Sequence, residues 1–121
     1  MLIVEDDGRS RKLVRDVLSA DGLRTIEAAS GADALAIAAE ELPDVILLDL
    51  GLPDMNGIDV VRALKAHERT ARIPVVALTA MRTEDDDGWL RAAGFSACIE
   101  KPIDVRGFPA RIRSHAAPAS T

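Results

Sequence analysis

Residues 2–7 have the sequence Leu-Ile-Val-Glu-Asp-Asp, a short apolar run that ends abruptly in three acidic side chains. A second run of this kind, Val-Ile-Leu-Leu at 45–48, is followed by Asp49. Three more short segments of this kind occur along the chain, two of them continuously apolar, and segments with helical periodicity separate them. This alternation is typical of an α/β fold, in which helices cover both faces of a parallel sheet. The sequence therefore predicts five strands, at 2–4, 24–28, 45–48, 75–78 and 97–99.

The intervening segments have the apolar spacing of amphipathic helices. The first helix carries an apolar stripe of Leu13, Val14, Val17 and Leu18, and the third carries Val60, Val61 and Leu64. Both stripes are expected to face a core. The second helix, at 32–42, should turn Leu35 and Ala38 inward and end before Pro43.

The last two helices have less regular patterns. The acidic run at 83–87 suits the positive end of a helix dipole, so we expect a fourth helix to begin there and to end at Gly94. The fifth helix is expected to begin late or to bend, because Gly107 and Pro109 fall where its first turns should be.

Length and composition limit the class of protein. A chain of 121 residues with 48% hydrophobic and 29% charged residues is the size of one globular domain. Its single cysteine, Cys98, excludes an intramolecular disulfide, and its net charge of −5 disfavours direct binding to nucleic acid. No signal peptide or membrane-spanning run is evident. We therefore expect a cytoplasmic domain at 1–114, without membrane attachment, and a flexible tail at 115–121.

Polar side chains follow four of the five predicted strands. Glu5 and Asp6 follow the first, Asp49 the third, Thr79 the fourth and Lys101 comes shortly after the fifth. Ligands of open α/β sheets bind beyond the carboxyl ends of the strands. These groups are therefore expected to meet in one pocket.

The residue types in this pocket favour phosphoryl transfer. Three neighbouring carboxylates repel each other unless a cation compensates, and oxygen ligands of this kind suit Mg²⁺. A carboxylate can also attack phosphorus, provided that positive charge stabilises the phosphoryl oxygens. Lys101 offers an ammonium group and Thr79 a hydroxyl donor. The sequence thus predicts that a phosphoryl group is transferred to a side chain.

These motifs resemble the response regulator receiver family over Leu2 to about Ser114. The acidic opening at 2–7, the segments Leu48-Asp49 and 52–57, Leu78-Thr79-Ala80 and Lys101-Pro102 carry the resemblance. It implies a doubly wound five-stranded sheet of the flavodoxin and CheY type, with strand order 2-1-3-4-5. It also implies that Asp49 is phosphorylated and that Mg²⁺ is bound by Asp6, Asp49, the backbone carbonyl of Gly51 and, directly or through water, Glu5. Thr79 and Lys101 would contact the phosphoryl group, and the peptide bond before Pro102 would be cis.

The resemblance further implies a signalling protein of a two-component phosphorelay. Its expected partners are a sensor histidine kinase or a histidine phosphotransferase, and a downstream protein target bound in a phosphorylation-dependent way. It is expected to be a monomer or a weak phosphorylation-dependent dimer, without an output domain. The protein would be no enzyme, although it would assist its own phosphorylation and dephosphorylation. Cys98 departs from the family pattern, because an aromatic switch residue often stands at that position.

Three other classes remain as alternatives. A phosphohydrolase that forms an aspartyl-phosphate normally needs a second acid near the nucleophile, where this chain has Gly51. A constitutive interaction module would need none of the acidic, Thr and Lys residues. A nucleotide-binding domain lacks its glycine-rich loop after the first strand.

Overall fold

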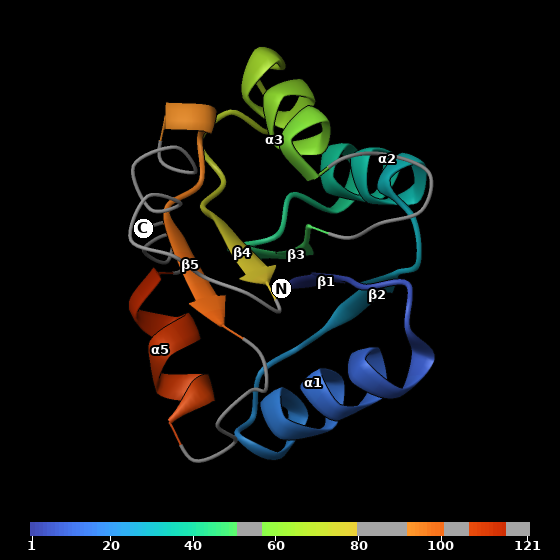
Figure 1. Ribbon diagram of the computed structural model, residues 1–121, viewed down its shortest axis with the longest axis vertical. Helices are drawn as coiled ribbons and strands as arrows, with labels where there is room; N and C mark the ends of the chain where they lie inside the picture. The colour runs from blue at the N-terminus through green and yellow to red at the C-terminus, as the bar shows by residue number, and fades with distance from the viewer. Residues whose placement is uncertain (51–56, 80–91, 101–106, 116–121) are drawn as a thin grey trace.

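A computed structural model of the chain describes residues 1–50, 57–79, 92–100 and 107–115 (Figure 1). Strands and helices alternate through these residues, as the sequence predicts. The elements are β1 (Leu2–Val4), α1 (Gly8–Ala20), β2 (Ile26–Ala28), α2 (Gly31–Glu41), β3 (Ile46–Asp49), α3 (Gly57–Ala66), β4 (Val75–Thr79), β5 (Ala97–Glu100) and α5 (Phe108–His115). The predicted strands agree with the observed ones except at their ends.

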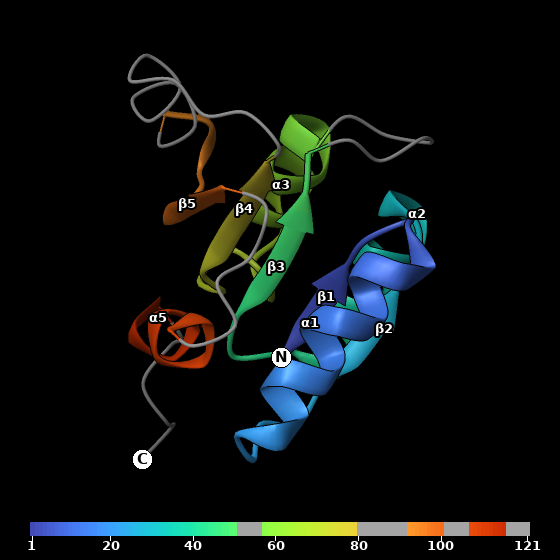
Figure 2. The same ribbon diagram turned by 60° about the horizontal axis from the view of Figure 1, so that its bottom comes forward.

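The five strands form one sheet with the order β2-β1-β3-β4-β5, and every pair is parallel. Val4 at the end of β1 is aligned with Ala28 on one side and with Leu48 on the other. All carboxyl ends therefore lie at one edge of the sheet (Figure 2). This topology confirms the predicted doubly wound fold.

Helices cover both faces of the sheet, α1 and α5 one face and α2 and α3 the other (Figures 1 and 2). Each face has its own hydrophobic cluster. The α1/α5 cluster includes Ile3, Val14, Leu18, Val76, Leu78, Phe108 and Ile112. The α2/α3 cluster includes Leu2, Val4, Ala34, Ala38, Leu48, Val61 and Leu64. Burial of these apolar side chains is the main favourable contribution to folding.

The predicted core stripes are confirmed with one exception. Val14 and Leu18 of α1 are buried and Val17 packs against them, but Leu13 is 47% exposed. The prediction that Leu13 faces the core is therefore wrong. At 100° per residue Leu13 and Leu18 lie at opposite margins of the apolar arc, and the helix turns the side of Val14 and Leu18 to the sheet. In α2, Ala38 is buried and Leu35 is partly buried against the core.

Polar side chains cap the amino-terminal ends of the first two helices. The Asp7 carboxylate accepts a hydrogen bond from the Arg9 backbone N–H at the start of α1, and the Ser30 hydroxyl accepts one from the Asp33 N–H at the start of α2. The end of α2 is unusual, because Leu42 has a left-handed backbone with φ of 48°. Pro43 disfavours the right-handed helical region for the residue before it.

A lysine holds the connection between α3 and β4. Lys65 donates through Nζ to the carbonyl oxygens of Ala71 at 3.1 Å and Ile73 at 2.8 Å. Desolvation by burial lowers the pKa of Lys65 below its ordinary value. Next to this side chain is Gly94, whose φ of 119° suits glycine.

The carboxyl-terminal elements fit the sequence in part. Pro109 is the second residue of α5, within the first turn, where a missing N–H costs nothing. The helix ends at His115, one residue beyond the predicted domain boundary. The expected start of the fourth helix at 83–87 and residues 116–121 of the predicted tail lie outside the described residues.

Candidate functional site

Three carboxylates lie together at the carboxyl edge of the sheet. Glu5 and Asp6 directly follow β1, and Asp49 is the last residue of the neighbouring strand β3. One carboxylate oxygen from each lies within 4.8 Å of the other two. Glu5 is 1% exposed, whereas Asp6 is exposed and Asp49 is half-buried. The predicted convergence of these three residues is thus observed.

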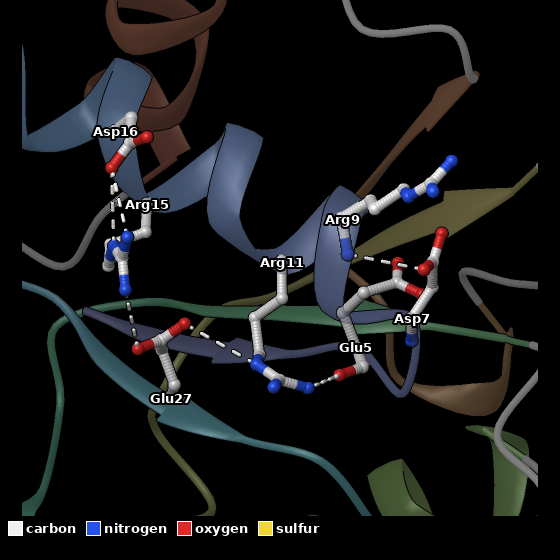
Figure 3. A network of polar contacts seen from close by, with 7 residues as sticks. All are labelled: Glu5, Asp7, Arg9, Arg11, Arg15, Asp16 and Glu27. Atoms are coloured by element: carbon white, nitrogen blue, oxygen red, sulfur yellow. Dashed lines mark hydrogen bonds and ion pairs between the residues drawn. The ribbon is translucent and has the colours of Figure 1, made fainter.

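The main chain and side chain of Glu5 are both held in place. Its backbone N–H donates to the carbonyl oxygen of Ala28 at 3.1 Å, which extends the pairing of β1 with β2 by one residue. Its Oε1 accepts from the Asp7 N–H at 3.3 Å, and its carbonyl oxygen accepts from Arg11 Nη1 at 2.8 Å (Figure 3). A buried carboxylate is costly unless hydrogen bonds or a cation stabilise its charge.

Asp7 has a different role from the two acids before it. Its carboxylate accepts from the Ser10 hydroxyl at 2.9 Å and from the Arg9 N–H at 3.2 Å. These hydrogen bonds, the one from Ser10 first, lower the pKa of Asp7. Asp7 therefore caps α1 and orients the loop that follows β1. An acidic residue directly before a helix is a recognisable cap signal in the sequence.

Asp49 is fixed by the strand pairing around it. Asp49 is aligned with Leu78 of β4, and the next N–H, that of Leu50, donates to the Leu78 carbonyl at 3.2 Å. Gly57 at the start of α3 packs closely here, since a Cβ at this position would lie 3.1 Å from the Leu50 Cα. A glycine thus lets α3 begin directly against the residue that follows Asp49.

The donor set fits a hard divalent cation. All three side chains offer oxygen, and their separation allows oxygens from more than one of them to reach a single ion. The exposed side of Asp6 leaves room for water or ligand oxygens, which such ions retain. A cation would also offset the mutual repulsion of the carboxylates.

The remaining predicted site residues are described only in part or not at all. Thr79 ends β4 and is aligned with Glu100 of β5, so its backbone lies at the same edge as Asp49. Its side chain lies outside the described part of the structure, as do Gly51, Lys101 and the bond before Pro102. The roles assigned to these residues stay predictions.

One further sequence expectation can be compared with the structure, and one contact was not expected. Cys98 is 7% exposed within the α2/α3 cluster, which agrees with a small buried hydrophobic residue. The contact of Arg11 with the Glu5 carbonyl was missed, because no motif includes it. An arginine pair spaced four residues apart, opposite an acidic strand residue, was the available signal.

Comparison with known protein families gives a match over nearly the whole chain. The family described as response regulator receiver domain matches residues 1–113. The chain is 42% identical over 115 residues to the polar-differentiation response regulator DivK of Brucella ovis, covering 95% of this chain and 94% of that protein. DivK of Brucella anthropi is 40% identical over the same length. None of the helices in the described ranges is long and apolar enough to cross a membrane.

Solved structures have the same fold. The chemotaxis protein CheY4 of Vibrio cholerae has a TM-score of 0.88 and 26% identity, and the alignment covers 94% of this chain and 95% of that one. The receiver domain of a sensor histidine kinase of Pseudomonas aeruginosa PAO1 has a TM-score of 0.85 and 28% identity over 94% of this chain and 93% of its own. That structure has a magnesium ion coordinated in the active site cleft.

Proposed function

Since the chain belongs to the response regulator receiver family, we propose that Asp49 accepts a phosphoryl group and that the phosphorylated domain then binds a protein target. The donor is a phosphohistidine of a sensor kinase or a histidine phosphotransferase. The approach of one oxygen each from Glu5, Asp6 and Asp49 to within 4.8 Å carries the proposal. A cluster of this kind at the carboxyl edge of a parallel sheet is suited to phosphoryl chemistry.

The transfer is a substitution at phosphorus. A carboxylate oxygen of Asp49 attacks the phosphorus atom and forms a new O–P bond, while the bond from phosphorus to the donor imidazole breaks. The electron pair of the broken bond stays on the imidazole nitrogen. Hydrolysis later returns the phosphoryl group to water and restores the carboxylate. The protein is thus a phosphoacceptor and not a turnover enzyme, although its own residues assist both steps.

The other site residues bind and orient the reacting groups. Glu5, Asp6 and Asp49 would hold Mg²⁺, together with the backbone carbonyl of Gly51. A bound Mg²⁺ supplies positive charge to the phosphoryl oxygens. The Thr79 hydroxyl and the Lys101 ammonium are proposed to contact the same oxygens, in keeping with the chain's membership of the receiver family. The magnesium ion in a related receiver structure supports the choice of cation.

The same proposal covers the wider setting. We assign one receiver domain to residues 1–114, extended by His115 as the last residue of α5, and a tail to the residues that follow, with signalling by protein binding and without direct contact to nucleic acid or membrane. The domain acts in the cytoplasm as a monomer or as a weak dimer that forms on phosphorylation. Gly51 stands where a phosphohydrolase would need its second acid, which weighs against that alternative. The presence of Glu5, Asp6 and Asp49 weighs against a constitutive interaction module.

Intact-mass measurement after incubation with a small phosphodonor and Mg²⁺ tests the proposal. The wild-type chain should gain one phosphoryl group, and Asp49→Asn should gain none. Asp44→Asn is the matched control, because Asp44 is an exposed acid two residues before the opposite end of β3 and should not affect labelling. Chelation of Mg²⁺ should abolish labelling of the wild type.

The outcomes separate the alternatives. Labelling of Asp49→Asn at the wild-type level would move the acceptor to another residue. An unlabelled wild type in the presence of Mg²⁺ would favour a constitutive interaction module.

A further inference from the structure

Arg11 connects the acidic loop to a neighbouring strand. It lies in α1, and its Nη1 donates to the Glu5 carbonyl oxygen at 2.8 Å (Figure 3). Its Nε lies 3.4 Å from Oε1 of Glu27, in the edge strand β2. The guanidinium presents several N–H donors in one rigid plane, so a single side chain can hold both acceptors. Arg11 therefore connects helix α1 both to strand β2 and to the loop that follows strand β1.

The bond to the Glu5 carbonyl acts on the peptide group between Glu5 and Asp6. Because a peptide group is planar, rotation about ψ of Glu5 moves the Glu5 carbonyl oxygen and the Asp6 Cα together, so a bond that holds this oxygen also restricts where the Asp6 backbone and side chain lie. On the other side of Glu5, the N–H is held by the Ala28 carbonyl at 3.1 Å. Because both of its backbone polar groups are hydrogen-bonded, the Glu5 backbone keeps one orientation. The backbone from which the Asp6 carboxylate projects is therefore held in place as well.

Arg15 provides a natural comparison one turn further along α1. Its Nη1 lies 3.5 Å from Oε2 of the same Glu27, and its guanidinium also pairs with Asp16 at 3.2 Å. Arg11 and Arg15 have similar partial exposure, with 25% and 39% of their side chains accessible. They thus share a charge, a helix and an acidic partner, whereas the Glu5 carbonyl contact is made by Arg11.

We propose that Arg11 is a positioning residue for the cation site, acting through the Glu5–Asp6 peptide, with Glu27 as its anchor. The inference rests on the proposed function, because it concerns the Mg²⁺ that Glu5, Asp6 and Asp49 would hold. Groups that orient metal ligands without touching the metal commonly change metal affinity strongly when they are removed.

Charge and geometry predict opposite results for this residue. Loss of a positive charge near a cluster of carboxylates should by itself strengthen the attraction of a cation. Loss of the peptide contact should weaken cation binding, because the Asp6 carboxylate then samples orientations that do not fit. The sign of the change in affinity therefore distinguishes a positioning role from a purely electrostatic one.

The experiment compares Arg11→Gln with Arg15→Gln by calorimetric titration of Mg²⁺, without any phosphodonor. Arg11→Gln should raise the Kd for Mg²⁺ about tenfold, at the lower end of what loss of an orienting partner causes. Arg15→Gln should leave the Kd within about twofold of the wild type, because surface ion pairs contribute little. Both variants lose only partly exposed contacts, and far-UV circular dichroism should show that both are folded.

A second measurement reports on the hydrogen bond in the metal-free protein. The ¹³C chemical shift of the Glu5 carbonyl, observed through the Asp6 amide, should move upfield in Arg11→Gln and stay unchanged in Arg15→Gln. A hydrogen bond deshields a carbonyl carbon, so this shift tests the contact separately from metal binding.

The inference fails if Arg11→Gln binds Mg²⁺ as tightly as Arg15→Gln or more tightly, or if the Glu5 carbonyl shift does not respond. In those cases wild-type Mg²⁺ binding and phosphorylation of Asp49 would stand unaffected. A wild-type chain that binds no Mg²⁺ would instead overturn the cation site of the proposed function, and the role of Arg11 with it.

Discussion

Replacing Asp6 by Asn should stabilise the protein in the absence of metal. The substitution removes one charge from a cluster in which an Asp6 oxygen lies no more than 4.8 Å from oxygens of both Glu5 and Asp49. At that separation two like charges repel by about 0.9 kcal/mol in water and by about 3.5 kcal/mol at an effective dielectric constant of about 20. Asp6 is exposed, so the lower figure is the closer one. We expect a gain of about 1–2 kcal/mol in the free energy of unfolding.

Thermal melting followed by circular dichroism at low ionic strength measures this gain. For a domain of this size it corresponds to a rise in Tm of about 4–8 °C in EDTA. Mg²⁺ at about ten times its Kd should stabilise the wild type by about 1.4 kcal/mol, and the variant by much less, because it lacks a ligand. The difference between the two proteins should therefore shrink when Mg²⁺ is added.

Asp7→Asn is the matched control for this experiment. Asp7 is also an exposed acid, next to Asp6 in the chain, but it caps α1 and lies outside the cluster. Asparagine caps helices about as well as aspartate, so this variant should show no gain in Tm. The reasoning is refuted if Asp6→Asn melts at or below the wild-type temperature in EDTA, or if Mg²⁺ stabilises it as much as the wild type.

Three further substitutions test the packing around the site and the loops, each by urea denaturation. Leu42→Gly should increase stability by about 1 kcal/mol, because Leu42 has φ of 48° and glycine adopts that region without strain; no gain would contradict the strain. Gly57→Ala should cost about 1–3 kcal/mol, since its Cβ would lie 3.1 Å from the Leu50 Cα, and full stability would mean that α3 shifts freely. Lys65→Met should cost about 1–3 kcal/mol, because it removes the donor to the Ile73 carbonyl. Burial lowers the pKa of Lys65, so the folded chain releases this proton first and the wild-type advantage should grow as pH rises towards 10.5; a constant difference would contradict that shift.

The strands could be predicted because the sheet is covered on both faces, whereas their order was implied by the resemblance to the receiver family. Most strands of this kind are short and continuously apolar, and the polar residues that follow four of the five predicted strands mark the edge where ligands bind. Asp49 and the Glu5-Asp6 pair were found in this way. Their approach within 4.8 Å depends on the alignment of Val4 with Leu48. The residue patterns of the two strands do not indicate this register.

Other features depend on contacts that local patterns do not encode. Leu13 belongs to the apolar arc of α1, but tertiary packing decides which part of that arc meets the sheet, so its 47% exposure was not predicted. Pro43 indicated where α2 ends, because it disfavours the right-handed helical region at Leu42. The left-handed conformation that Leu42 takes at the end of α2 was not expected. The bond from Arg11 to a backbone carbonyl involves no particular acceptor side chain, so the spacing of Arg11 and Arg15 was only an indirect signal of it.

The separation of the two core clusters has a consequence for how the protein can evolve. Successive residues of β1 belong to different clusters, Ile3 to the α1/α5 cluster and Leu2 and Val4 to the α2/α3 cluster. Side chains of one layer can therefore be exchanged without touching those of the other, and the two helical surfaces can diverge independently. A shift of the β1 backbone reaches both layers and the carboxylate edge at once. Natural variation should accordingly accumulate in the helices far faster than in this strand.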